Sequence, residues 1–341
     1  MLAAPQQVTT SESCESEMGN RVSLKEVDGA EILSLMDDAV DFTSTIQRKE
    51  ASKVREWTKK RKGIKWVKKH FSLPFAEHGF SVLIKIFYKE APHTILFDTG
   101  LSAEGVVDNA RRLGVELADV ECVVLSHGHY DHFGGLVKVS KVIGKEDLPI
   151  IVHDDAFKIR GVMNRDGSMR EYPIFPPENQ ISPAHYLRRK HPTLLGDKTI
   201  LVSGEIPRKT DFEEGFKRHY VFSGGKWLPD PWIWDDQAVI INVKHKGLVV
   251  VSGCAHAGIV NTTLYAQQIT SVAKIYSIMG GFHLAGKDCE TRINQTVEML
   301  QQFNPEIIVP MHCTGWRGKY AISTAMPHAF VSNSVGNLYR F

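Results

Sequence analysis

The densest group of potential metal ligands lies in one six-residue segment, His127-Gly128-His129-Tyr130-Asp131-His132. Random placement of the chain's 15 histidines would produce this pattern in about one sequence in a thousand. Imidazole nitrogens and a carboxylate together suit zinc, iron or manganese. We expect His127 and His129 to bind a first metal ion, and Asp131 and His132 to bind a second.

Four ligands cannot complete two coordination spheres, so distant residues must contribute as well. Three further histidines follow segments with the pattern of strands: His256 in residues 252–258, His283 in residues 280–284 and His312 in residues 309–315. A single histidine is more often structural than a ligand. Here, however, three histidines lie at predicted strand ends, and the chain also holds the 127–132 cluster. We therefore expect at least two of the three to belong to the metal site.

The elements that must position these residues follow from apolar periodicity. A buried strand over residues 120–125 runs directly into the cluster, and Gly128 permits a tight turn there. Helical spacing covers residues 102–113, with Gly114 placed to end the helix. Further helices are predicted at residues 262–273 and 290–303, and further strands at 31–36, 80–88, 94–97, 149–152, 238–243, 247–251, 275–279 and 306–309.

Both halves of the chain therefore supply strands and amphipathic helices. Two sheets packed face to face, with helices outside, would bury all of these strands, so residues 25–341 are interpreted as one domain. Residues 1–22 are polar and are predicted to form a flexible tail. Residues 160–235 show little periodicity and are predicted to be a loop-rich lid or substrate segment, with a short strand near residues 198–202.

Residues 48–70 form a strongly basic insertion, part of which has the spacing of a helix with one apolar face. Two interpretations are open. The segment is either a surface for phosphate-rich partners or anionic lipid, or a solvated insertion whose lysines maintain solubility.

Composition narrows the class of protein. Apolar residues make up 43% of the chain, enough for a large core, and the net charge of +2 favours neither nucleic acid nor a membrane surface as partner. No secretory signal and no membrane-spanning apolar run is evident, and nothing indicates an oligomeric state.

An odd number of cysteines without CxxC spacing fits a reducing compartment, so the chain is expected to be cytoplasmic. The cysteines are Cys14, Cys122, Cys254, Cys289 and Cys313.

The HxHxDH element after an apolar strand resembles the hallmark of the metallo-β-lactamase superfamily. Further segments are similar to the subfamily often labelled 7,8-dihydropterin-6-methyl-4-(β-D-ribofuranosyl)aminobenzene-5′-phosphate synthase. They are residues 77–81, 96–100, 203–208, 235–238, 253–256, 280–284 and 312–315. The resemblance covers about residues 30–341 apart from the basic insertion.

This resemblance implies an α/β protein with an αββα sandwich of two mixed sheets, and a metal site at one edge between the sheets. It implies His127 and His129 on one metal ion, and Asp131 and His132 on the other. His312 matches a further ligand of the second metal. Asp98 matches an aspartate that accepts a hydrogen bond from a ligand histidine and so fixes its tautomer.

One position departs from the pattern of the superfamily. Most dinuclear members have an aspartate that bridges the metals, and here Cys254 stands at that position, with His256 two residues later. We expect His256 to bind the first metal. Cys254 is either a thiolate ligand or a buried cysteine that only packs. Two zinc ions are expected, with iron or manganese as alternatives.

The ligand set indicates metal-assisted hydrolysis. A bound metal lowers the pKa of water to about 7 and polarises a substrate oxygen. Asp131 and His283 are the candidate catalytic residues, and His78 could also face the substrate. The resemblance suggests a phosphorylated or pterin-like small molecule as substrate. Arg208, like Arg160 and Arg165, could clamp a phosphate, and Trp234 could wall an aromatic pocket. Ordinary surface arginines and a tryptophan within a lid are the alternatives.

Three functions compete. The first is a small-molecule hydrolase that acts on a phosphoester, lactone or thioester. The second is a nuclease or phosphodiesterase that holds nucleic acid with residues 48–69, against which the modest net charge argues. The third is a non-hydrolytic role, either a di-iron redox protein on the same fold or a binding protein that kept the fold.

Overall fold

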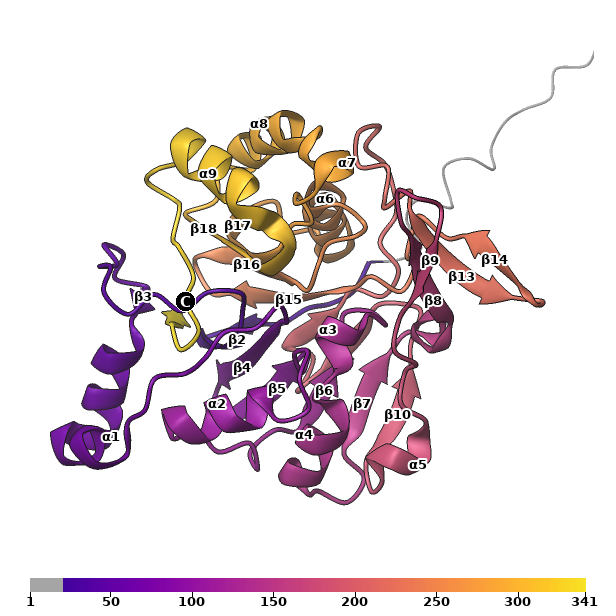
Figure 1. The fold of residues 1–341 in the computed structure, drawn as a ribbon. Helices are drawn as coiled ribbons and strands as arrows, with labels where there is room; N and C mark the ends of the chain where they lie inside the picture. Colours follow the sequence, from indigo (N-terminus) through magenta and orange to yellow (C-terminus); the bar gives the residue numbers. More distant parts are fainter. Residues whose placement is uncertain (1–20) are drawn as a thin grey trace, which may run out of the picture.

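The computed structural model describes residues 21–341, so the predicted tail, apart from its last two residues, lies outside the described residues. Two large sheets pack face to face, and helices cover the outer side of each (Figure 1). This arrangement confirms the αββα sandwich. A smaller third sheet projects from one end of the molecule (Figure 1).

The first large sheet has eight strands in the order β10-β7-β6-β5-β4-β2-β19-β3. Strands β5, β6, β7 and β10 run parallel, so their carboxyl ends meet at one edge. The segments that carry Asp98 and the 127–132 cluster leave the sheet at this edge. The strands are β2 (Gly29–Met36), β3 (Ala51–Ser52), β4 (Ser81–Tyr88), β5 (Ala91–Phe97), β6 (Cys122–Val124), β7 (Pro149–Val152), β10 (His185–Arg188) and β19 (Leu338–Arg340).

The second large sheet follows the order β11-β12-β15-β16-β17-β18, with β1 paired to β15. Strands β16, β17 and β18 are parallel, and Cys254, His283 and His312 follow their carboxyl ends. The strands predicted at residues 238–243 and 247–251 are confirmed as β15 and β16, which pair as an antiparallel hairpin. The strands are β1 (Glu26–Val27), β11 (Thr193–Leu195), β12 (Ile200–Val202), β15 (Ala238–Val243), β16 (Gly247–Ser252), β17 (Ile275–Gly281) and β18 (Ile307–Met311).

Three apolar layers hold the sandwich together. The central layer lies between the sheets and joins residues such as Ile84 and Phe97 of the first sheet to Val251 and Val309 of the second. One outer layer packs α1 (Val54–His70), α2 (Gly105–Leu113), α4 (Leu136–Ile143) and α5 (Glu178–Ile181) on the first sheet. The other packs α6 (Ile259–Thr270), α8 (Ile293–Phe303) and α9 (Gly315–Ala325) on the second. Short helices are α3 (Tyr130–Phe133), α7 (Lys287–Glu290), η1 (Asp154–Phe157) and η2 (His312–Thr314).

The segment 160–235 is more regular than the sequence suggested. It contributes most of a third, antiparallel sheet in the order β14-β13-β8-β9, here called the accessory sheet. Its strands are β8 (Ile159–Met163), β9 (Met169–Glu171), β13 (His219–Ser223) and β14 (Lys226–Pro229). Strands this short, joined by glycine-containing turns, give too few alternations for a periodic signal.

Part of the basic insertion is helical, as predicted. The chain from Val54 to His70 forms α1, interrupted at Gly63, whose φ of 82° breaks the helical path. The helix is anchored by Trp57, whose indole Nε1 donates to the carbonyl oxygen of Gly336 at 2.7 Å. Within residues 21–341, no helix combines the length and apolar character needed to cross a membrane.

Candidate metal centre

The carboxyl edges of the two large sheets bring the predicted ligand histidines together. His127, His129, His132, His256 and His312 are all buried, with at most 6% of each residue exposed. They come from three separate segments of the chain, which follow β6, β16 and β18.

The first group consists of His127, His129 and His256. One ring nitrogen from each lies within 4.8 Å of the others, and the Nε2 atoms of His127 and His256 are 3.1 Å apart. The structure thus brings together the three residues predicted for the first metal.

The second group surrounds the carboxylate of Asp131. Its Oδ2 lies 3.3 Å from His312 Nε2, 3.9 Å from His132 Nε2 and 3.7 Å from His78 Nε2. The side chain of His78 is 65% exposed, so it stands at the solvent side of this group. The residues predicted for the second metal therefore also lie side by side, with His78 as an additional neighbour.

Cys254 lies between the two groups. Its Sγ is 3.1 Å from His132 Nε2. Cys254 belongs to three potential ligand clusters. The first also contains His127 and His132, the second His256 and His283, and the third His312 and Cys313. Burial raises the pKa of the Cys254 thiol, so the thiol is neutral unless a cation is beside it. A bound metal would reverse this preference, because metal ligation deprotonates a thiol.

Asp98 fixes the orientation of two ligand rings, one directly and one through a neighbouring hydroxyl. Its carboxylate accepts hydrogen bonds from the Ser126 hydroxyl at 2.7 Å and lies 2.7 Å from His132 Nδ1, which must therefore donate. The Ser126 hydroxyl has then used its only hydrogen, so it accepts from His127 Nδ1 at 2.9 Å. Both rings consequently carry their hydrogen on Nδ1 and present a free Nε2 lone pair.

These free lone pairs fit a metal ion. Burial lowers the pKa of His127, His129 and His256 well below the ordinary value, so the three rings are neutral. Nδ1 of His312 and Nδ1 of His256 are buried without a hydrogen-bond partner among the described residues. Buried nitrogens are rarely left unpaired, and neutral imidazoles with carboxylate and thiol groups nearby suit zinc or iron.

Several carboxylates that sequence reasoning did not single out as site residues hold the backbone of the ligand turns. Asp235 accepts from the Gly128 amide at 2.7 Å, Asp236 from the Ala257 amide at 2.9 Å, and Asp37 from the His312 amide at 2.7 Å. Of these, Asp235 and Asp236 lie in residues 235–238, one of the segments that carry the family resemblance. Asp37 carried no comparable signal.

Arg160 pairs with one of these buried carboxylates and is not a surface clamp for phosphate. Its guanidinium is buried and forms a bidentate pair with Asp235. Nη1 lies 2.8 Å from Oδ2, and Nη2 lies 2.5 Å from Oδ1. The Arg160 side chain therefore neutralises the carboxylate that holds the Gly128 turn.

His219 is a further site neighbour that the sequence did not reveal. It begins β13 of the accessory sheet, is fully buried, and places its Nε2 3.0 Å from His129 Nε2. Burial, together with the charge of Arg160, lowers the pKa of His219 to about 4, so the ring is neutral. No local spacing links this histidine to the cluster 90 residues earlier.

A cavity of about 140 Å³ opens onto both groups. His283 lines it, and its ring centroid is 4.2 Å from that of His256. At the cavity wall, the Arg170 guanidinium lies 5.3 Å from the centre of the Tyr172 ring, and its Nη1 donates to the Tyr130 hydroxyl at 3.4 Å. The other lining residues are His78, His129, Asp131, Phe216, Cys254, His256 and Cys313.

The structure does not bring Arg208 and Trp234 to this cavity, where the sequence suggested a substrate role for both. The Arg208 guanidinium lies 4.8 Å from the centre of the Trp234 ring and donates to the backbone carbonyl oxygens of Trp232 and Ile233 at 2.6 and 3.2 Å. Its two terminal nitrogens thus donate within the fold, and neither residue lines the cavity.

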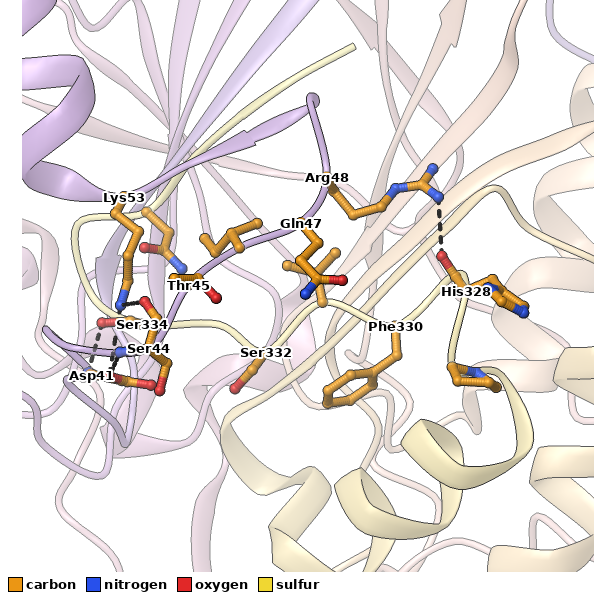
Figure 2. A pocket seen from close by; sticks show the side chains of 14 residues that line it. Asp41, Ser44, Thr45, Gln47, Arg48, Lys53, His328, Phe330, Ser332 and Ser334 are labelled. Atoms are coloured by element: carbon orange, nitrogen blue, oxygen red, sulfur yellow. Dashed lines mark hydrogen bonds and ion pairs between the residues drawn. The ribbon is translucent and has the colours of Figure 1, made fainter.

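A second cavity, of about 420 Å³, lies between residues 41–53 and residues 327–337 (Figure 2). Its cations are already paired: Arg48 Nη2 is 2.6 Å from Glu306 Oε1, and Lys53 Nζ is 3.6 Å from Asp41 Oδ1. It contains none of the clustered ring nitrogens found at the sheet edges. The histidine-lined cavity is therefore the candidate site.

Comparison with known proteins agrees with this geometry. The model of the metallo-β-lactamase superfamily matches residues 77–267. A protein of the archaeon Methanocaldococcus jannaschii, named 7,8-dihydropterin-6-methyl-4-(β-D-ribofuranosyl)-aminobenzene-5′-phosphate synthase, is 29% identical over 80% of this chain and 92% of its own length. An uncharacterized protein of the same archaeon is 33% identical over 77% of this chain and 93% of its own length.

Among solved structures, that of Tm1679 is similar, with a TM-score of 0.65 and 24% identity. The match covers 92% of this chain and 98% of that one. Tm1679 is described as a metal-dependent hydrolase of the β-lactamase superfamily. At this level of identity the likeness concerns the fold.

Proposed function

The chain belongs to the metallo-β-lactamase superfamily, and on that basis we propose that it is a metal-dependent hydrolase of a small ester that carries an anionic group. The observation that supports the proposal is the convergence of free ring nitrogens in one buried cluster, part of which lines the cavity. The Asp98–Ser126 pair leaves Nε2 of His127 and of His132 without hydrogen, and both point into the cluster beneath that cavity.

Two zinc ions would be held by the two groups, with iron or manganese as alternative metals. His127, His129 and His256 would bind the first ion, and Asp131, His132 and His312 the second, with the Cys254 thiolate between them. When bound, the metals lower the pKa of water and polarise the substrate oxygen, which is the chemistry that hydrolysis requires.

Asp131 and His283 are the candidates for proton transfer. Burial alone would raise the pKa of Asp131, but the neighbouring His132 and His312 hold it below its ordinary value. The carboxylate is therefore anionic at neutral pH, the state that both metal binding and a role as general base require. His283 lines the cavity beside His256, which is where a proton donor to the leaving group would need to lie.

The cavity supports a small, negatively charged substrate. A volume of about 140 Å³ admits the reacting group of a small molecule. Arg170 supplies a positive charge at the wall, and Tyr172 and Phe216 supply aromatic surface. Phosphoesters, lactones and thioesters with an anionic group are the substrate classes that fit.

A second candidate function follows from the similarity to the named archaeal relative. Its name describes a synthase whose product contains a pterin, an aminobenzene group and a 5′-phosphate, and the likeness extends over 80% of this chain. A phosphorylated aromatic molecule would also suit Arg170 and Tyr172. The two candidates differ in whether water is a reactant.

The test is a panel of phosphomonoesters, phosphodiesters, lactones and thioesters, each with and without an anionic group. Metal-depleted protein is reconstituted separately with zinc, iron(II) or manganese before each assay. The proposal expects metal-dependent hydrolysis of at least one anionic ester, which Asp131→Asn reduces at least a hundredfold. Stoichiometric metal binding without hydrolysis of any class would contradict it and favour the synthase-like reaction.

A further inference from the structure

We propose that His219 is a positioning residue that fixes the tautomer of His129, so that His129 binds the first metal through Nδ1. This inference rests on the proposed metal site and concerns a residue outside the ligand set. Because His219 is the first residue of strand β13, the accessory sheet would then help to orient a ligand of the metal site.

The position of the hydrogen on the His219 ring is fixed by its surroundings. His219 Nδ1 lies 2.8 Å from the backbone carbonyl oxygen of Asp230, and a carbonyl oxygen can only accept. Nδ1 must therefore carry the hydrogen. In a neutral imidazole, the form that burial favours, Nε2 is then left with a lone pair.

That lone pair determines the state of His129. The Nε2 atoms of His219 and His129 are 3.0 Å apart, a normal hydrogen-bond distance, and two lone pairs at this distance would repel. Because His219 Nε2 has no hydrogen, His129 Nε2 must donate one. Neutral His129 then has its lone pair on Nδ1, and this is the nitrogen it can offer to a metal ion.

A metal ion between the two Nε2 atoms is the alternative, and the ligand geometry argues against it. Among residues 21–341, His129 shares a potential ligand cluster with His127 and His256, and no such cluster includes His219. A metal between His129 and His219 would have two protein ligands, whereas protein metal sites of this chemistry use three or four.

The accessory sheet touches the HxH segment at a second point, which makes this support rigid. In the register of β8 and β13, His219 pairs with Val162 and Val221 pairs with Arg160. Arg160 in turn binds Asp235, which accepts from the Gly128 amide. The sheet therefore holds both the backbone at Gly128 and the ring of His129.

The test compares His219→Phe, which keeps a ring but removes the acceptor, with His219→Gln, whose amide oxygen can still accept from His129. Zinc affinity is measured by competition with a chromophoric chelator, independently of catalysis. We expect His219→Phe to weaken binding of the first ion about 10- to 100-fold, and His219→Gln to retain most of the affinity. His153→Phe is the matched control, because His153 is also buried but contacts Glu205 outside the site.

The tautomer is read directly from nitrogen-15 NMR of the zinc-loaded wild-type protein, which does not depend on how any variant folds. The inference expects the proton of His129 on Nε2 and zinc on Nδ1. Zinc on Nε2, unchanged affinity in His219→Phe, or loss of one bound ion in both His219 variants would overturn it. Failure of the wild-type protein to bind zinc would instead contradict the proposed function itself.

Discussion

At the scale of single residues, one carboxylate governs two ligand rings. Asp98 accepts from the Ser126 backbone amide, from the Ser126 hydroxyl and from His132 Nδ1, each at 2.7 Å. The close approach of Gly253 is part of the same arrangement, since a Cβ there would lie 2.1 Å from the Ser126 hydroxyl oxygen. Glycine is thus needed at position 253 so that the hydroxyl can connect Asp98 to His127.

Replacement of Cys254 tests whether its sulfur binds metal. If the thiolate lies between the two ions, Cys254→Ala should lower the affinity for the second ion at least tenfold, and Cys254→Asp should restore much of it because a carboxylate can bridge. Cobalt substitution offers a second measurement, since a sulfur-to-cobalt charge-transfer band is expected only with Cys254 present.

Cys122→Ala is the matched control for Cys254. Burial raises the pKa of the Cys122 thiol to about 12, so this equally buried cysteine remains protonated. Full cobalt and zinc binding by Cys254→Ala, with the charge-transfer band retained, would mean that Cys254 only packs.

Replacement of Arg170 tests the charge of the substrate. A charge-assisted hydrogen bond contributes about 1.5–3 kcal/mol, and the exposure of Arg170 places it at the lower end. We therefore expect Arg170→Met to raise KM for an anionic ester about tenfold with little change in kcat, and to leave a neutral ester of the same size unaffected. Equal losses for both esters would argue against recognition of the anionic group.

At the scale of elements, the accessory sheet is coupled to the metal centre through a buried ion pair. Removing one partner of such a pair leaves a buried charge unpaired and costs about 3–5 kcal/mol. We expect Arg160→Met to lower the free energy of unfolding by about this amount, measured by urea denaturation, and the double variant with Asp235→Asn to recover part of the loss. Arg165→Met, at the exposed β8–β9 turn, should be nearly neutral.

Helix α1 carries many positive charges on the surface, but none of its residues lines the candidate site. Its apolar residues Val54, Trp57 and Val67 pack inward, whereas Lys59, Lys60, Lys62 and Lys65 are exposed. Joint replacement of these four lysines by glutamine should keep kcat/KM for a small ester within about twofold, because none of them lines the cavity. A large loss despite unchanged thermal unfolding would give the helix a role in substrate binding.

The strongest predictions from sequence concern elements that are locally encoded. The strand before the 127–132 cluster is continuous and apolar, and Gly114 adopts the left-handed conformation that ends α2 as expected. His256 and His312 could be identified because each lies within a few residues of the end of a recognisable strand. The strands of the accessory sheet escaped prediction because each has at most five residues and pairs mainly across turns.

Contacts between distant segments could not be predicted in the same way. His129 and His219 are 90 positions apart, and Asp37 and His312 are 275 apart, with no spacing rule that connects them. Such partners are determined by the packing of whole layers. Sequence therefore identified most candidate ligands, and the structure was needed to find the residues that orient them.

At the scale of the whole molecule, the candidate metal centre joins the two halves of the sandwich. The eight-stranded sheet contributes Asp98 and the 127–132 cluster, and the seven-stranded sheet contributes Cys254, His256 and His312. None of these groups converges in an unfolded chain, so metal binding is expected to stabilise the native state.

The most direct test of the metal centre is anomalous X-ray diffraction from crystals of the zinc-loaded protein, collected on both sides of the zinc absorption edge. The account expects two anomalous peaks, one enclosed by His127, His129 and His256, the other by Asp131, His132 and His312. Zinc bound only elsewhere on the molecule, or ligand rings turned away from one another around an empty centre, would contradict it.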